Sequence, residues 1–503
     1  MPFDFDYDLI VAGDGIAGFT VAHSAAFHSN QNARILLIAR NSLKELGKKT
    51  TDGWPCGDAV NAERLDHLSK NLHLNYGWPE IEHEVDGVGV VSPDYQTHHN
   101  FEGRGYILNR KIFPQKMYEL ARNLGVEFLF ESSVEDLIIM EGSVVGVEGR
   151  QNNKTTFRKY AKVVVDATGM ASPLRRKLHD KFVEKEIVQE NDVVAIKRYI
   201  LYFDPKNIEK NKFDPKRALI HLDQEGAPGG YKWNFAKGEN KVNIGVGISN
   251  KLRKIRNQEF GRNDTLLSFN EDYTQDIIGV SLKEAQKNMF TGKLPRLADG
   301  EGDIGNEKNS WQASVRRHND LLVSNGVLLA GDSAFGPRAV DAGGMGNAFI
   351  QGEIAGEEIA TAIEKNDFSR ESLWRYNYEY NQTKAGRNAA VWEVFRRFLQ
   401  KQPNRELNYG MKKIVRPEDI SKFVQSDYPE FEEADERGLG NKLKILIKHG
   451  RHLGLLRDLA FFEEKAIKLQ QHYKNTPESF KEYPEWRKEL NMQMNEAFER
   501  FPL

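Results

Sequence analysis

Three glycines near the start of the chain have the spacing that a phosphate-binding turn requires. The segment GDGIAG places Gly13, Gly15 and Gly18 directly after the apolar run of residues 7–12. Gly13 permits a tight turn, Gly15 lets the backbone approach a pyrophosphate, and Gly18 lets the next helix pack closely on the strand. The N-terminus of that helix attracts phosphate charge. The pattern predicts a dinucleotide site formed by Gly13, Gly15, Ala17 and Gly18.

The acidic residue that usually binds the ribose hydroxyls is missing. It is expected at the end of the second strand, roughly 20 residues after the glycine turn. Here the predicted strand of residues 34–39 ends in Ala39 and is followed by Arg40. We expect backbone groups or Arg40 to hold the ribose. A changed preference for the adenosine end is the alternative.

Length and composition describe a large globular chain. With 503 residues, two or three packed domains are expected. The mean hydropathy is −0.61, and no uncharged apolar run approaches the ~18 residues of a membrane span. The net charge of −2 argues against a protein that coats nucleic acid.

The single cysteine limits both the chemistry and the compartment. Cys56 has no second cysteine to pair with, which excludes an intramolecular disulfide, a CxxC redox pair, a cysteine-rich zinc site and a Cys-ligated iron–sulfur cluster. The acidic N-terminus does not resemble a secretory signal. We expect a cytoplasmic protein, with peripheral contact at the inner face of the membrane as a further option. No pattern predicts a metal site.

The remaining pattern alternates strand-like and helix-like segments. Hairpin-like patterns occupy residues 85–98 and 134–148, and Pro114 and Gly125 bound a predicted helix. Residues 193–250 are rich in strand signals, residues 285–312 contain a polar, glycine-bearing stretch that indicates an exposed insertion, and residues 370–503 have helical patterns throughout.

Two later segments indicate that the dinucleotide is FAD. VVVDATG, at residues 163–169, resembles the strand and glycine turn that return to the nucleotide in FAD proteins of the glutathione-reductase type. Residues 327–349 resemble their second flavin segment, which implies that Asp332 reaches the ribityl chain. Gly169, Gly344 and Met345 are the other flavin-contacting residues that this resemblance implies.

These segments predict an α/β fold, α+β overall. It would combine a glutathione-reductase-type FAD-binding Rossmann domain, an antiparallel-sheet substrate domain and a helical C-terminal region. The FAD-binding domain is expected to be discontinuous. The boundaries are residues 1–80, 105–185 and 315–368 for the FAD-binding domain, 81–104 and 186–314 for the substrate domain, and 369–503 for the helical domain.

Four segments together resemble one family. They are WPCGDAV at 54–60, GYILNR at 105–110, the Y-x-W-x-F pattern at 231–235, and a segment at 395–413. The chain resembles archaeal geranylgeranyl reductases, FAD enzymes that saturate the isoprenoid chains of ether lipids. The resemblance implies flavin contacts from Cys56, Gly57, Ala59, Arg110 and Val134. It also implies a substrate tunnel lined by Tyr231, Trp233 and Phe235.

The chain departs from the family pattern near both motifs. Ala236 stands where the family has proline after the aromatic motif, and Ala339 and Ala342 replace a proline and a glycine of the flavin-side loop. Arg338 and Asp341 add charges to that loop. We expect these changes to have little effect on flavin binding, and they leave the identity of the prenyl substrate open.

The resemblance also implies catalytic roles. Saturating an isolated C=C needs a hydride from reduced FAD, a proton and a dry apolar site. Cys56 is the main candidate for a modulator or proton relay, although a lone buried cysteine is more often inert packing. Asp58 and Tyr231 are weaker candidates, and a water is another. By pattern alone, the aromatic row is more often core, and it is the family resemblance that favours the tunnel.

The electron donor is not specified by the sequence. We find no second nucleotide fingerprint, so a ferredoxin-like carrier or NAD(P)H remains open. Basic residues expected to be exposed could dock an acidic carrier or form ordinary surface: Lys48, Lys49, Arg175, Arg176 and Lys177.

Two other function classes are kept. One is an FAD-dependent monooxygenase or halogenase of the same fold, although flavin halogenases have a W-x-W-x-I-P motif in place of Y-x-W-x-F. The other is a flavin-free prenyl-lipid carrier, against which the intact glycines and Asp332 argue.

Residues 442–462 combine leucine, isoleucine and phenylalanine with basic residues. They predict either an interfacial helix, broken near Gly450, or an ordinary helix packed on the protein.

Overall fold

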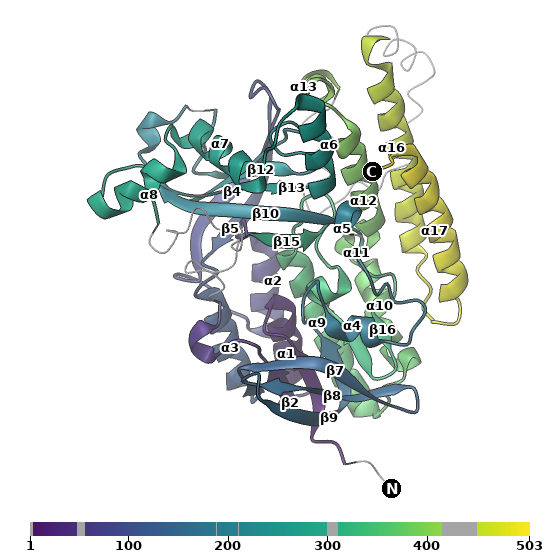
Figure 1. The fold of residues 1–503 in the computed structure, drawn as a ribbon. Helices are drawn as coiled ribbons and strands as arrows, with labels where there is room; N and C mark the ends of the chain where they lie inside the picture. The colour runs from purple at the N-terminus through teal and green to yellow at the C-terminus, as the bar shows by residue number, and fades with distance from the viewer. Residues whose placement is uncertain (1–3, 48–55, 188, 210, 299–309, 415–449) are drawn as a thin grey trace.

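The computed structural model describes residues 4–47, 56–187, 189–209, 211–298, 310–414 and 450–503 (Figure 1). Two sheets and a helical C-terminal region make up this part of the chain. Among these residues, no helix is long and apolar enough to cross a membrane.

The first sheet is built around five parallel strands. Short apolar runs such as YDLIVA are buried on both faces, as a central parallel strand requires. The order is β16-β17-β9-β1-β2-β6, and the hairpin β7–β8 continues into β9. The strands are β1 (Tyr7–Ala12), β2 (Ile35–Ile38), β6 (Glu127–Leu129), β7 (Ser132–Met140), β8 (Ser143–Gln151), β9 (Thr155–Asp166), β16 (Val323–Ser324) and β17 (Val327–Leu329).

Two helices far apart in sequence pack against each other beside this sheet. Small residues make the close approach possible: a Cβ on Gly352 would lie 2.6 Å from Thr20, and one on Gly356 would lie 2.4 Å from Ser24. The N-terminal glycine turn and the last strand of the sheet are thereby held together. The helices are α1 (Ile16–His28) and α9 (Met345–Lys365), and α3 (Phe113–Asn123) also contacts α1.

The second sheet has nine strands and is mainly antiparallel, in the order β14-β10-β13-β12-β11-β4-β5-β3, with β15 beside β10. One parallel pair joins β4 to β11. Its strands are β3 (Ala59–Asn61), β4 (Ile81–Val91), β5 (His98–Leu108), β10 (Val193–Tyr202), β11 (Arg217–His221), β12 (Tyr231–Gly238), β13 (Lys241–Ile248), β14 (Arg296–Leu297) and β15 (Trp311–Ser314).

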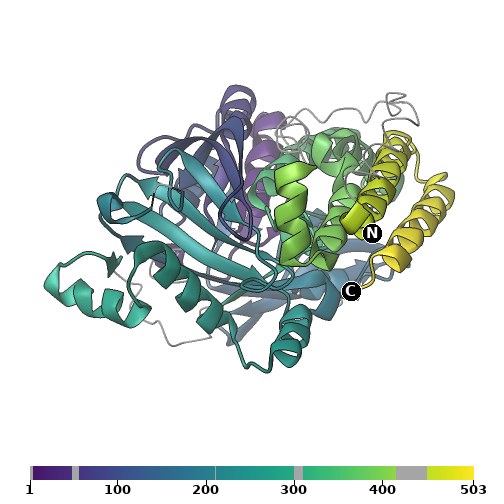
Figure 2. The same ribbon diagram turned by 90° about the horizontal axis from the view of Figure 1, so that it is seen from above.

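Helices cover the second sheet and complete the C-terminal region. In Figures 1 and 2, α6 (Asn250–Phe260), α7 (Leu266–Ile278) and α8 (Leu282–Thr291) lie on one side of this sheet. The C-terminal helices form a separate group beside both sheets (Figure 2). They are α10 (Arg370–Gln382), α11 (Lys384–Arg387), α12 (Ala389–Lys401), α13 (Asn404–Lys413), α16 (Leu453–Lys474) and α17 (Tyr483–Arg500). The remaining helices are α2 (Ala62–Leu72), α4 (Pro173–Lys177) and α5 (Gln189–Asp192).

The predicted fold class is confirmed: a Rossmann-type parallel sheet, an antiparallel sheet and a helical C-terminal region are all present. The helix predicted from Pro114 to Gly125 spans Phe113–Asn123, because Pro114 occupies its first turn. The domain boundaries stay a prediction. β3, at residues 59–61, hydrogen bonds with β5 of the second sheet.

Candidate active site

The glycine turn between β1 and α1 has the geometry of a phosphate-binding site. Gly13 has φ +123°, and a Cβ there would lie 2.2 Å from the backbone oxygen of Ala167. A Cβ on Gly18 would lie 2.0 Å from the backbone oxygen of Gly13, whereas one on Gly15 would meet nothing within 4 Å. Gly13 and Gly18 are therefore fixed by packing, while Gly15 borders open space at the N-terminus of α1. No acidic residue lies in the first turn of α1 to oppose a phosphate.

The two later segments meet this turn at the same edge of the sheet. Gly331, two residues after the end of β17, has φ +68°, and its Cβ position lies 2.7 Å from Ala17. Gly169 follows β9 and has φ +93°. A Cβ on Gly344 would lie 3.5 Å from Oδ1 of Asp332, at the N-terminus of α9. Parts of the chain more than 300 residues apart thus converge where parallel strands end.

Arg110 and Asp332 supply the polar groups of this region. The Arg110 Nη1 donates to Met345 Sδ across 3.0 Å, and its Nε is buried without a hydrogen-bond partner in the described structure. Burial raises the pKa of the Asp332 carboxyl to about 6, against the opposing effect of Arg110. An orphaned guanidinium nitrogen, a desolvated carboxyl and an open glycine turn are what a flavin dinucleotide would satisfy, so the residues present fit FAD.

The predicted adenosine end is less clearly defined. Arg40, two residues after the end of β2, is exposed, and Val134 is buried in β7. The backbone N–H of Ser132 donates to the oxygen of Ala39 across 2.9 Å, which brings the start of β7 to the end of β2. Arg40 and Val134 therefore flank the same strand end, and their nucleotide contacts remain a prediction.

The segment after Cys56 forms a tight turn. Asp58 has φ +66°, and its backbone N–H donates to Cys56 Sγ across 3.4 Å. Gly57 is required because a Cβ there would lie 2.6 Å from the Phe235 ring. Ala59 then enters β3. Burial raises the pKa of the Cys56 thiol, while Arg110 and Arg198 act in the opposite direction.

The aromatic row lies on one face of β12, opposite small residues. Ring centroids are 6.0 Å apart for Tyr231 and Trp233, and 6.3 Å apart for Trp233 and Phe235. Gly247 pairs with Tyr231 and Gly245 with Trp233 across β13. A Cβ on Gly245 would lie 2.2 Å from the indole, so the glycine makes room for the ring.

Tyr231 connects this row to the loop before α9. Its hydroxyl donates to the backbone oxygen of Asp341 across 2.6 Å, and burial raises its pKa. The Arg338 Nε donates to Asp341 Oδ1 across 2.9 Å. The two charged departures from the family pattern thus pair with each other and position a loop against Tyr231.

Two polar residues of the site were missed by the sequence analysis. Asn243 donates to the backbone oxygen of Cys56 across 2.7 Å and to Asp58 Oδ2 across 2.9 Å, and it accepts from the Trp233 indole across 3.1 Å. Lys237 Nζ lies 3.0 Å from the same Asp58 Oδ2. For Lys237 the available signal was its place two residues after Phe235 in β12, since alternate strand residues share a face. Asn243 pairs with Phe235 from the neighbouring strand β13, which local pattern alone does not show.

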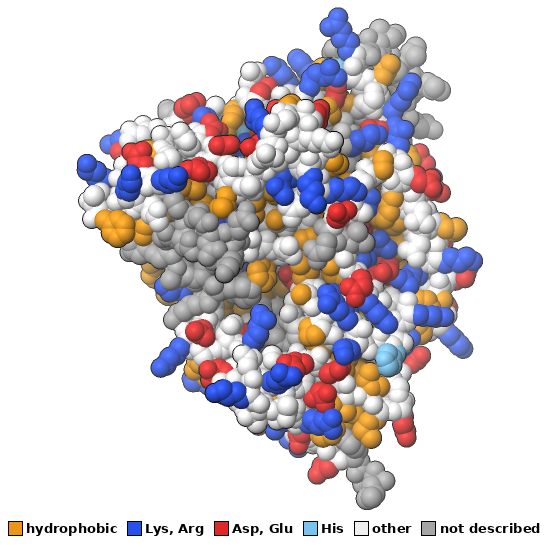
Figure 3. All heavy atoms as spheres, viewed as in Figure 1, with side chains coloured by type: hydrophobic (Ala, Val, Ile, Leu, Met, Phe, Trp, Pro, Cys, Tyr) orange, Lys and Arg blue, Asp and Glu red, His pale blue; other side chains and the backbone are white. Residues whose placement is uncertain are grey.

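The expected basic docking surface is partly wrong. Arg175 is fully buried: it donates to the backbone oxygens of Ser333 and Met170 across 2.5 and 2.8 Å. Arg176 and Lys177 are exposed and pair with Glu186 and Asp136, and Lys48 and Lys49 lie outside the described residues. On the face in Figure 3, basic and acidic side chains are interspersed.

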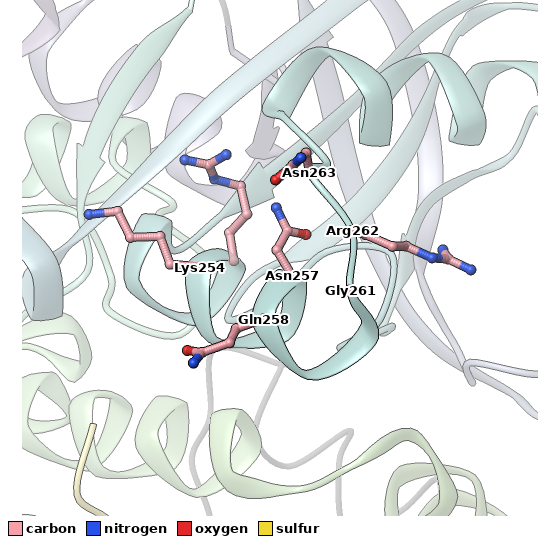
Figure 4. Close-up of a pocket in the computed structure, with 7 residues that line it drawn as sticks. Lys254, Asn257, Gln258, Gly261, Arg262 and Asn263 are labelled. Carbon is pink, nitrogen blue, oxygen red and sulfur yellow. The ribbon is translucent and has the colours of Figure 1, made fainter.

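A separate polar hollow of about 490 Å³ lies at the end of α6 (Figure 4). Its lining is Arg253, Lys254, Asn257, Gln258, Gly261, Arg262 and Asn263. None of these is a predicted site residue, so the hollow forms no part of the candidate active site.

Two family models match parts of the chain. Residues 203–281, which include β12 and β13, match the model of the geranylgeranyl reductase catalytic domain. Residues 68–194 match an FAD binding domain. FAD is therefore the cofactor.

Known proteins resemble the chain over most of its length. It is 30% identical over 497 residues to the digeranylgeranylglycerophospholipid reductase of Sulfolobus acidocaldarius, covering 98% of each chain. Digeranylgeranylglycerophospholipid reductase 1 of Methanopyrus kandleri is 27% identical to this chain, and the match covers 74% of this chain and 85% of the Methanopyrus protein.

Solved structures share the fold. A geranylgeranyl bacteriochlorophyll reductase-like protein from Thermoplasma acidophilum has a TM-score of 0.65 at 23% identity, covering 90% of this chain and 99% of its own. The myxobacterial chondrochloren halogenase has a TM-score of 0.58 at 15% identity, covering 92% and 97%. Both likenesses show the fold alone. With its glycine turn, flavin-side carboxyl and aromatic strand, the chain belongs to the geranylgeranyl reductase family of FAD-dependent oxidoreductases.

Proposed function

We propose that this enzyme uses FAD to saturate C=C bonds in the geranylgeranyl chains of archaeal-type ether lipids or their precursors. The observation that carries the proposal is the 30% identity to a digeranylgeranylglycerophospholipid reductase over 98% of both chains. The matched region includes the C-terminal helices as well as the second sheet, so the similarity is not confined to a shared cofactor domain.

The cofactor site uses residues from five parts of the chain. Gly13, Gly15, Ala17 and Gly18 receive the pyrophosphate at the N-terminus of α1. Gly169, Asp332, Gly344 and Met345 come from the later segments, and Arg110 and the residues of the Cys56 turn complete the set. Bound FAD supplies hydride-transfer chemistry.

The protein's own residues exclude water and hold the alkene. Trp233 is 3% exposed and Phe235 is 7% exposed, so the face of β12 beside the Cys56 turn is dry. Such a surface suits a prenyl chain, which offers no polar group to a hydrogen-bond donor.

Cys56 is the best-placed proton donor. Because burial raises its thiol pKa, the thiol stays protonated at neutral pH. The Tyr231 hydroxyl is directed at Asp341, and the Asp58 Oδ2 is engaged by Lys237 and Asn243. Tyr231 and Asp58 are therefore better placed to position neighbouring groups of the site than to donate a proton to the alkene.

The proposal is tested with FAD-loaded protein reduced anaerobically by dithionite. Incubation with a digeranylgeranyl phospholipid should add two hydrogen atoms per double bond, measured by mass spectrometry of the lipid. Unchanged lipid mass after flavin reoxidation would contradict the proposed reaction. Purified protein without flavin would instead support the carrier, and halide incorporation into an aromatic substrate the halogenase.

The natural reductant is a separate part of the proposal. A ferredoxin-like carrier or NAD(P)H would supply electrons. Anaerobic bleaching of the flavin absorbance, followed with each donor in turn, distinguishes them. A donor that fails to bleach the flavin within a turnover time is excluded.

A further inference from the structure

A buried lysine lies behind the Cys56 turn. Lys237 occupies a bulge in β12, where the pairing with β13 shifts between Ala236 and Gly238. Its side chain is only 2% exposed. A bulge redirects a side chain and is often found beside active sites. Burying an ammonium group costs free energy unless acceptors take its protons, so the groups that Lys237 contacts indicate what it does.

The three protons of Lys237 are all accommodated. Its Nζ lies 3.0 Å from Asp58 Oδ2, 3.0 Å from Glu82 Oε2 and 2.9 Å from the backbone oxygen of Leu108. Lys241 pairs with the other oxygen of Glu82 across 2.5 Å. Two carboxylates and two ammonium groups therefore alternate from the buried Asp58 to the partly buried Lys241, and the charges balance.

Lys237 and Asn243 meet at one oxygen of Asp58. Through Asn243, that oxygen is joined to the backbone of Cys56 and to the indole of Trp233. Asp58 also has a left-handed backbone, which a non-glycine residue adopts only when its surroundings hold it there. The backbone oxygen of Asp58 accepts from Leu108 N–H across 2.8 Å. Leu108 thus binds both the turn and Lys237.

We propose that Lys237 is the positioning residue that locks the Cys56–Asp58 turn against the aromatic strand, so that the thiol and the prenyl-binding row keep one fixed relation. This inference rests on the proposed function for its catalytic meaning. Lys237 touches neither the thiol nor the aromatic rings in this arrangement; it acts through Asp58 and Leu108.

The single cysteine makes the inference measurable without substrate. Alkylation of Cys56 by iodoacetamide reports directly on the turn, because no other thiol is present. In FAD-loaded Lys237→Met we expect Cys56 to be alkylated about tenfold faster than in wild type. That factor corresponds to a loss of about 1.4 kcal/mol in the free energy that keeps the turn closed. We also expect the pH midpoint of alkylation to fall, because an opened turn removes the burial that raises the thiol pKa. The charged and titratable groups facing the thiol are Arg110, Asp58, Arg198 and Tyr231.

A matched control lies in the same strand. Lys232 is also buried and paired, with Asp223 across 2.6 Å, but its side chain is on the opposite face of β12. Lys232→Met should leave the alkylation rate within about twofold of wild type. Equal rates and equal pH midpoints for wild type and folded Lys237→Met would overturn the inference, as would equal acceleration by the two lysine variants.

A second variant covers the case in which Lys237→Met does not fold. Asp58→Asn weakens the link to Lys237 without leaving an unpaired buried anion, and it should accelerate alkylation about threefold or more. An unchanged rate there would overturn the inference. Because the assay needs no lipid and no electron donor, a failure of the proposed reduction would leave the thiol result standing, and the two failures can be distinguished.

Discussion

The side-chain amide of Asn243 donates to the backbone oxygen of Cys56 across 2.7 Å, although 187 positions separate them in the chain. The same amide group contacts Asp58 and accepts from Trp233. The turn that carries the thiol is therefore fastened to the strand that carries the aromatic row. A substitution in that strand should therefore change the environment of Cys56, and a substitution at Cys56 should change the environment of the aromatic row.

Gly15→Val should abolish FAD loading while the fold survives. A Cβ on Gly15 meets nothing within 4 Å, so the side chain is tolerated by the protein and occupies the space for the pyrophosphate. The measurement is the flavin absorbance of the purified variant together with its circular dichroism. Gly18→Ala is the contrasting variant, since its Cβ would lie 2.0 Å from a backbone oxygen and should destabilise the fold itself. Normal flavin content in Gly15→Val would refute the assigned phosphate site.

Cys56→Ser should retain FAD and alter catalysis. A serine hydroxyl is a far weaker acid than a thiol, so a proton relay through this position would slow, by roughly 10²-fold or more. Single-turnover reoxidation and the number of saturated bonds per lipid measure the effect. Cys56→Ala serves as the packing control: if both variants give wild-type products at wild-type rates, Cys56 has no part in the mechanism.

FAD affinity should rise between pH 5 and pH 7. Burial raises the pKa of Asp332 from 3.8 to about 6 in the flavin-free protein. Because the folded protein without flavin holds the Asp332 proton more tightly than the unfolded chain does, the contribution of this carboxyl to the free energy of unfolding is highest below pH 3.8. This contribution is lost as the pH rises through about 6. A ribityl hydroxyl that donates to the carboxylate favours the ionised form, so binding releases a proton in this range. Titration of apoprotein with FAD at several pH values gives the dependence.

Asp332→Asn provides the control for that pH effect. It should weaken FAD binding at pH 7, because an amide oxygen is a poorer acceptor than a carboxylate. It should also flatten the pH profile between pH 5 and pH 7. A profile as steep as that of wild type would assign the titration to another group.

Leu455→Asp should destabilise the protein by about 3 kcal/mol, because a carboxylate would replace a buried side chain. Leu455 is 6% exposed in α16, which packs on α12, and a Cβ on Gly410 would lie 3.5 Å from it. Thermal unfolding measures the loss. Leu459→Ser, at a half-buried position one turn later, should cost less.

The interfacial alternative for residues 442–462 is tested through the lysine residues of that segment. Lys444 and Lys448 lie outside the described residues, and α16 begins at Leu453. Binding to anionic liposomes at low salt, compared with Lys444→Glu/Lys448→Glu, tests peripheral contact. Wild-type protein that stays in the supernatant would argue against it.

Local sequence patterns predicted the features of the fold that local backbone geometry determines. The glycine spacing at 13–18 and the apolar run before it specify a strand, a turn and a helix through their own sterics. The alternation of Tyr231, Trp233 and Phe235 placed their side chains on one face of a strand for the same reason.

Long-range polar partners could not be predicted in this way. Lys237 meets Asp58 and Glu82 only because β12, β4 and the turn before β3 come together in the second sheet. Arg175 looked like a surface residue in the run PLRRK, yet the backbone oxygens that accept its protons belong to segments on either side of it in the chain. Burial of a charge depends on such partners, which tertiary structure alone supplies.

The late return of β17 to the first sheet has a consequence for how the enzyme is made. β9 ends at Asp166 and its neighbour β17 begins at Val327. At ~5–20 residues per second, roughly 10–30 s of translation separates the two strands. During that interval the nascent sheet has an open edge along β9, and Gly331, Asp332 and Met345 do not yet exist. Under the proposed site assignment, flavin capture awaits the last third of synthesis, so bound FAD would mark chains in which β17 and the start of α9 have already joined the first sheet.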